Sequence, residues 1–163
     1  MNQENQRMST IPSVNVGMLI RRPAHEVFQA IADPAITSKI WYTKSSGKMT
    51  PGAELTWEWE MHGASTRTSV QEVDDNSRIR FTWDNYTPDA PTTVEFRCTP
   101  MPDDTTYVHI TETGFTGTAD ELVHYLTDST GGFTFLISAL KALLEHDIVL
   151  TLVADANPGG QPD

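Results

Sequence analysis

A carboxylate at position 112 is the side chain best placed to do chemistry, because the strand pattern around it directs it inward. In YVHITET, residues 107–113, Val108 and Ile110 alternate with polar residues, so Glu112 falls on the apolar face of the expected strand. A charged carboxylate without a partner is costly there, so we expect it to be paired, hydrated or protonated. Glu112 would then anchor the polar end of a ligand or mark a wet cavity. The alternative is a bulge at the strand end that turns the carboxylate to solvent.

The histidines do not form a recognisable metal site. They are scattered along the chain, and neither an H-E-x-x-H nor a C-x-x-C motif is present. Glu121 and His124 make a single E-x-x-H, whereas a carboxylate-bridged metal site needs a second copy. We therefore expect no metal and no cofactor.

Nucleophilic catalysis finds no support in the motifs either. The sequence has no G-x-S-x-G, and Cys98 falls in mid-strand on an inward face, where a cysteine usually acts as a small core residue. An enzyme of cyclase or hydrolase type would have to use Glu112 as general acid or base. Such work normally needs a second polar group, and the strand pattern supplies only Thr68, so we name no catalytic residue.

The charge balance excludes two classes of partner. Asp and Glu outnumber Lys and Arg by 22 to 11, which gives a net charge of −11. Such a surface repels phosphate backbones and anionic lipid heads, so we expect no nucleic acid and no membrane as partner. One cysteine, no apolar run long enough to span a bilayer and no signal-peptide pattern lead us to expect a cytoplasmic protein.

The middle of the chain predicts an antiparallel meander with one solvated face. In ELTWEWEM, residues 54–61, an inward aromatic face alternates with an anionic one, and the inward face carries Leu55, Trp57, Trp59 and Met61. Further alternating segments run over 66–73, 77–83, 93–98 and 107–113, and the first strand is expected at 14–20. One domain over 13–155 is expected, with flexible tails at 1–12 and 156–163.

Helical signals flank this meander. Pro23 opens a helix, and Asp33 can cap a second short one that begins at Pro34. Thr118 and Glu121 match a capping box, and 131–146 has apolar residues at three- and four-residue spacing. Gly131 and Gly132 are expected to separate the two C-terminal helices. The apolar segment 147–155 would either cover a homodimer contact or pack back on the sheet.

This order of elements resembles the helix-grip fold of the START-like superfamily. The local sequence is most similar to the branch named after the activator of the heat-shock-protein-90 ATPase. The likeness rests on RRPAHEVFQAIADP (21–34), IWYT (40–43), GAELTWEWEMHG (52–63) and GGFTFLISALKALLEH (131–146), and it spans roughly 14–147. The chain departs from the branch at Phe133, where Trp is usual, at Glu112, where many relatives have His, and in 147–155.

The resemblance implies an α+β fold in which a curved antiparallel sheet wraps around a long C-terminal helix, with two short helices after the first strand. It also implies a cavity between the sheet and this helix that binds a small hydrophobic or amphipathic molecule. A plain core is the alternative, and Trp41 and Tyr42 would line the cavity mouth or serve as a lid. The expected ligand-binding residues are Trp41, Trp57, Trp59, Thr68, Val70, Phe81, Trp83, Phe96, Ile110, Glu112, Phe133, Ile137 and Leu140.

The branch name suggests a second function, a co-chaperone-like interaction module whose acidic outer face steers it to a basic partner. Against this, one domain is present, without the chaperone-anchoring domain of the true activators. The partners we expect are therefore a small lipophilic molecule, with a chaperone as the alternative, and the chain would be a monomer or a homodimer.

Overall fold

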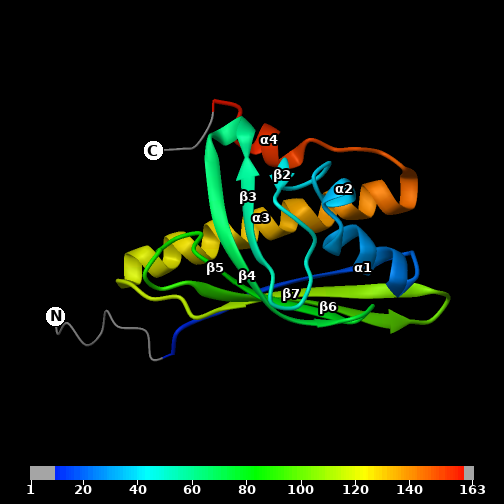
Figure 1. Cartoon of the computed structure of the whole chain (residues 1–163), viewed down its shortest axis with the longest axis horizontal. Helices are drawn as coiled ribbons and strands as arrows, with labels where there is room; N and C mark the ends of the chain where they lie inside the picture. The colour runs from blue at the N-terminus through cyan, green and yellow to red at the C-terminus, as the bar shows by residue number, and fades with distance from the viewer. Residues whose placement is uncertain (1–9, 160–163) are drawn as a thin grey trace.

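The computed structural model describes residues 10–159, which form one seven-stranded antiparallel sheet and a long helix that lies across it (Figure 1). The strand order is β1-β7-β6-β5-β4-β3-β2. The strands are β1 (Val14–Ile20), β2 (Lys44–Ser45), β3 (Glu54–Trp59), β4 (Ala64–Asp74), β5 (Arg78–Trp83), β6 (Thr92–Met101) and β7 (Thr105–Thr113). The helices are α1 (Ala24–Ala32), α2 (Pro34–Thr37), the 3-10 turn η2 (Glu60–His62), α3 (Ala119–His146) and α4 (Leu152–Ala156).

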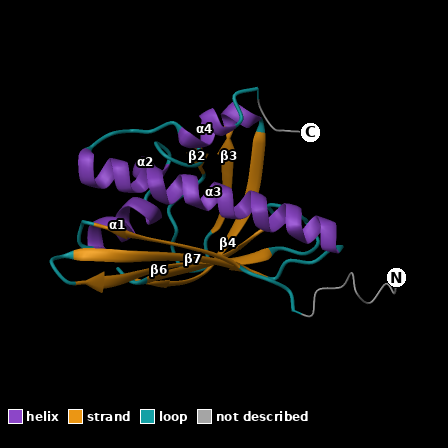
Figure 2. Cartoon of the chain, turned by 180° about the vertical axis from the view of Figure 1, so that it is seen from behind, coloured by secondary structure: helices purple, strands orange, loops and turns teal. Residues whose placement is uncertain are grey.

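The sheet bends strongly along its width. Seen from behind, β3 and β4 stand upright while β6 and β7 run beneath α3 (Figure 2). The pairing of β4 with β5 shifts register between Val70 and Glu72, and such a bulge increases local twist. The concave face of the bent sheet and one side of α3 therefore enclose the core. This architecture confirms the expected α+β helix-grip fold.

The alternation of side chains along the strands was predicted correctly. The residues predicted to face inward on β3 up to Trp59, and on β4 to β7, are all buried. Glu112 is among them and is 0% exposed. The expected first strand at 14–20 matches β1, which pairs with β7 along its whole length. β2 is an additional two-residue strand that the sequence did not predict.

The strand predicted at 54–61 ends two residues early. β3 stops at Trp59, and η2 turns the chain so that Met61 is 39% exposed instead of facing the core. Gly63 ends this turn in the left-handed region, at φ 63°, where a residue without a Cβ is least strained. The predicted inward position of Met61 was therefore wrong.

The short helices follow their capping signals. Pro23 is the N-cap of α1, and the Asp33 side chain accepts a hydrogen bond from the Ala35 amide (3.0 Å) at the start of α2. α2 covers only four residues, so the IWY segment that follows is not helical. This shortening frees Trp41 to turn into the core.

α3 is one continuous helix of 28 residues, so the break predicted at Gly131 and Gly132 was wrong. Two interior glycines cost the helix about 1 kcal/mol each. Buried residues on both sides of them, Ser129 and Phe133, face the sheet, and this packing outweighs the weak propensity. The predicted capping box is present, because Thr118 and Glu121 each bind the other's backbone amide.

The segment after α3 turns back over the molecule rather than extending the helix. Asp147 takes the left-handed conformation at φ 54°, and α4 follows after four non-helical residues. Leu150, Leu152 and Val153 pack against the core from outside. The predicted flexible tails lie mostly outside the described residues. Within residues 10–159, no helix combines the length and apolar character needed to cross a bilayer.

Candidate functional site

Trp41 lies at the centre of the space between the sheet and α3. Its backbone amide donates to the Thr37 carbonyl (3.0 Å), and the Thr37 hydroxyl in turn donates to the Ala30 carbonyl (2.6 Å). This corner between α1 and α2 aims the indole inward, where it is 6% exposed. Six rings surround it with centroids 5.1–6.1 Å away: Tyr42, Trp57, Trp59, Trp83, Phe96 and Phe133.

These seven rings and Phe81 form the aromatic cluster. Neighbouring rings in it lie 5.0–6.3 Å apart, which is within the range of direct aromatic packing. The interval in which a cavity was expected therefore contains the protein's own side chains, Trp41 in particular. Trp41 fills the centre of this interval, and it also lines a shallow groove at the surface.

Three polar atoms in or beside the cluster are buried without a hydrogen-bond partner. They are the Trp57 Nε1–H, the Thr68 hydroxyl and the Tyr42 hydroxyl, on residues that are at most 1% exposed. Burial raises the pKa of Tyr42 to about 12; the nearby Thr37 and Ser45 hydroxyls partly offset this, but neither meets hydrogen-bond geometry. Native proteins rarely leave buried polar groups unpaired, so this part of the core lacks hydrogen-bond partners that a bound molecule could supply.

Glu112 lies at the other end of the interior and is fully paired. Its Oε2 accepts hydrogen bonds from Trp83 Nε1 (2.8 Å) and from the Thr92 hydroxyl (2.5 Å), and the Ser129 hydroxyl contacts Oε1. Burial raises the pKa of the Glu112 carboxyl, and these three hydrogen bonds only partly oppose that shift. The carboxyl thus links β5, β6, β7 and α3.

A second carboxylate lies close to this end of the core. Asp128 accepts a hydrogen bond from the Tyr86 hydroxyl (2.7 Å), and its charge adds to the upward shift of the Glu112 pKa. The ring of Tyr86 packs against the ring of Tyr125 in a tilted arrangement, with centroids 4.8 Å apart. Among residues 10–159 no salt bridge reaches Glu112, so the protein supplies neutral donors to this carboxyl and no cation.

All thirteen side chains predicted to bind a ligand are buried, at 8% exposure or less. Seven of them belong to the aromatic cluster, and Thr68 lies directly across from Trp83 in the β4–β5 pairing. Sequence reasoning named Tyr42 beside Trp41, but it missed Thr92 and Ser129 as partners of Glu112. Ser129 could have been found, because it precedes Phe133 by four residues and so shares its helix face.

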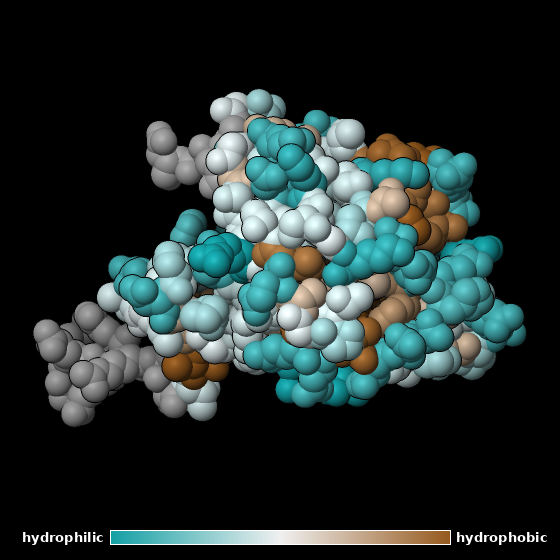
Figure 3. Space-filling model, viewed as in Figure 1, coloured by the Kyte–Doolittle hydropathy of each residue, from teal (hydrophilic) through white to brown (hydrophobic). Residues whose placement is uncertain are grey.

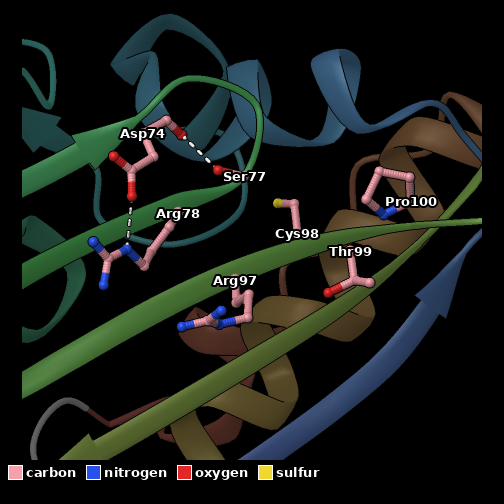
Figure 4. Close-up of a pocket in the computed structure, with 7 residues that line it drawn as sticks. All are labelled: Asp74, Ser77, Arg78, Arg97, Cys98, Thr99 and Pro100. Carbon is pink, nitrogen blue, oxygen red and sulfur yellow. Dashed lines mark hydrogen bonds and ion pairs between the residues drawn. The ribbon is translucent and has the colours of Figure 1, made fainter.

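Two of the hollows at the surface of the described residues have no lining residue from α3. One, of about 370 Å³, lies between the turn that leads into β5 and the later part of β6. Figure 4 shows its lining residues. Arg78 there is paired with Glu72, Asp74 and Glu95, so its charge is already compensated. The other, of about 200 Å³, is a groove on the surface side of Trp41, between the segment after α2 and the segment after α3.

Comparison with known proteins identifies relatives of this fold. The family described as "Activator of Hsp90 ATPase homolog 1-like protein" matches residues 21–145. A comparison with curated proteins found no match.

Several solved structures are similar. A protein from Staphylococcus saprophyticus is 26% identical, with a TM-score of 0.71 over 85% of this chain and 96% of that one. The Aha1 dimer from Colwellia psychrerythraea is 21% identical, with a TM-score of 0.68 over 83% and 97% of the two chains. A protein from the dynemicin biosynthetic locus is 20% identical, with a TM-score of 0.71 over 84% of this chain and 48% of that one.

Proposed function

The chain belongs to the family of Activator of Hsp90 ATPase homolog 1-like proteins, and from this premise and the polar gaps in its core we propose that it binds a small hydrophobic or amphipathic molecule. The ligand takes the place of Trp41 between the sheet and α3. The mechanism is burial: the apolar part of the ligand leaves water for aromatic walls, and one or two polar groups fix its orientation.

The observation that carries this proposal is a pair of unpaired atoms in the core: the Nε1–H of Trp57, whose ring packs against Trp41, and the hydroxyl of Thr68, opposite Trp83. An unsatisfied buried donor or acceptor costs roughly 1–3 kcal/mol. The Trp57 Nε1–H can only donate, and the Thr68 hydroxyl can donate or accept. A ligand with a carbonyl, hydroxyl or carboxyl oxygen near these two atoms would satisfy them both.

Trp41 is the ring that can leave with least disturbance. The other rings of the aromatic cluster, apart from Tyr42, stand on β3, β5, β6 or α3, where ladder or helix hydrogen bonds hold the backbone. Trp41 belongs to the irregular segment between α2 and β2. Its movement therefore opens the core without breaking the sheet or α3.

A titration with a library of fatty acids, alcohols and aromatic acids tests the proposal. We expect saturable quenching of tryptophan fluorescence together with a rise in melting temperature. Thr68→Val should stabilise the free protein yet weaken ligand binding. Thr106→Val is the control, because that buried hydroxyl donates to the Arg22 carbonyl (2.8 Å), outside the aromatic cluster, and its loss should destabilise the protein without changing affinity. No quenching and no thermal shift across the library would refute the proposal.

A second candidate function is a contact with a chaperone, favoured by the family match and by the net charge of −11. The acidic surface would steer the chain toward a basic partner, and such steering weakens with salt. Purified heat-shock-protein-90 chaperone, mixed with this chain at low and at physiological salt, tests this. Absence of both a complex and any change in ATP hydrolysis would exclude it.

A further inference from the structure

We propose that the groove outside Trp41 is the entrance to the ligand site and that it admits amphipathic anions of the fatty-acid type. This inference rests on the proposed function and adds the route, the cover and the class of ligand. The C-terminal strap, defined as residues 148–156, is the cover of the entrance. Lys39 receives the anionic head, and Trp41 is the gate.

The groove lies between the strap and the segment that follows α2. Its walls are mainly apolar, and its volume is about 200 Å³. Ligand pockets are commonly about 300–1,000 Å³, so the groove holds a bulky ligand only if a wall moves. The apolar lining residues are Ile40, Trp41, Met61, Leu150, Val153 and Ala154.

Trp41 is the one member of the aromatic cluster that also lines this groove. Its indole packs against the rings of Trp57 (5.1 Å) and Phe133 (5.9 Å) on its inner side. The Trp41 side chain thus contacts both the outer groove and the ring of Trp57, whose Nε1–H is buried without a partner. Rotation of this indole would extend the groove inward to Trp57.

The strap is lightly attached to the rest of the molecule. Within residues 10–159, one hydrogen bond joins it to a part of the chain other than α3 and the strap itself, between His62 Nε2 and the Val153 carbonyl (3.2 Å). Ile148 and Val149 are each 51% exposed, and Figure 3 shows hydrophobic surface where the chain passes from α3 to α4. No residue of the strap is fully buried, and such a segment opens at a lower free-energy cost than the core elements, which suits a removable cover.

Lys39 supplies the charge that selects the ligand. It lines the groove, is exposed, and makes no salt bridge within residues 10–159, whereas Lys44, Lys48 and Lys141 are each paired with a carboxylate. Asp155, the acidic residue of the strap, accepts a hydrogen bond from Thr151 (2.5 Å). In a chain of net charge −11, an unpaired ammonium beside an apolar groove favours a carboxylate head with an apolar tail.

Binding of dodecanoate and of dodecanol, followed by tryptophan quenching, tests the role of Lys39. Wild type should bind the acid more tightly, and Lys39→Gln should weaken acid binding by about fivefold while leaving the alcohol unchanged. Arg67→Gln is the control, because it removes the same charge from an exposed position on β4, away from the groove. Equal binding of acid and alcohol in wild type would overturn the anion preference, and quenching by both would still support the proposed function.

The gate and the strap have tests of their own. Trp41→Leu keeps an apolar filling but removes the indole, so it should tighten binding by about tenfold, because the cost of displacing the gate is lost.

Val153→Ser should raise the association rate several-fold in stopped-flow measurements, whereas Ile148→Ser, on the exposed side of the strap, should not. Unchanged rates in Val153→Ser would overturn the strap as cover. If neither probe binds to wild type or to Trp41→Leu, the entrance and the proposed function both fail.

Discussion

The two ends of the interior are equally buried but differ in how their polar atoms are paired. At the Glu112 end, Trp83, Thr92 and Ser129 each direct a polar group at the carboxyl. At the Trp57 end, the indole N–H and the Thr68 hydroxyl have no partner. A buried polar residue is therefore not by itself the mark of a site. The paired end holds the fold together, and the unpaired end is where a ligand has something to add.

The largest effect that tests this contrast is the loss of the Glu112 carboxyl. Glu112→Ala removes the shared acceptor of three buried donors, of which only Trp83 Nε1 keeps another acceptor, the Thr92 hydroxyl (3.0 Å), and it creates a cavity between β7 and α3. We expect the free energy of unfolding to fall by about 3–5 kcal/mol, measured by urea denaturation. A loss below about 1 kcal/mol would mean that these hydrogen bonds do not hold the fold together.

Glu112→Gln and pH separate the charge from the shape. Because burial raises the pKa of Glu112 above its ordinary value near 4.5, the folded state binds the proton more tightly than the unfolded state. The stability from this group is therefore complete below about pH 4.5 and declines as pH rises toward the folded-state pKa. The free energy of unfolding of wild type minus that of Glu112→Gln, measured by urea denaturation across this pH range, should show that decline. A difference that grows with pH would contradict it.

Sequence alone was sufficient for the faces of the strands. The period of two in β7 put Glu112 inward, and the departure from period two after β3 is the point at which the prediction for Met61 failed. The depth to which Trp41 reaches into the core could not be predicted, because it stands on an irregular segment whose direction is set by the Thr37 corner and not by any repeat. Gly131 was misread as a break because its propensity is local, whereas the packing that overrides it comes from the sheet.

A matched pair of tryptophan substitutions compares the two ends directly. Trp83→Phe and Trp57→Phe remove the same atoms from positions that are 5% and 0% exposed. Trp83→Phe also takes a donor from Glu112, so it should cost about 1.5–3 kcal/mol more than Trp57→Phe in the free energy of unfolding. Equal costs in thermal or urea denaturation would show that the unpaired N–H and the paired N–H are energetically alike.

The smallest effect compares two threonines on the concave face. Thr68→Val replaces an unpaired hydroxyl by a methyl group of similar size, so the free protein should gain about 1 kcal/mol of stability. Thr92→Val removes a donor to Glu112 and should lose about 1–2 kcal/mol.

The comparison becomes sharper when a ligand is bound: the gain from Thr68→Val should then disappear, because the hydroxyl it removes is one that the ligand would have satisfied. Calorimetric melting of both variants, with and without the library molecule that gives the strongest quenching, measures this. A gain of the same size in both conditions would place the ligand away from Thr68.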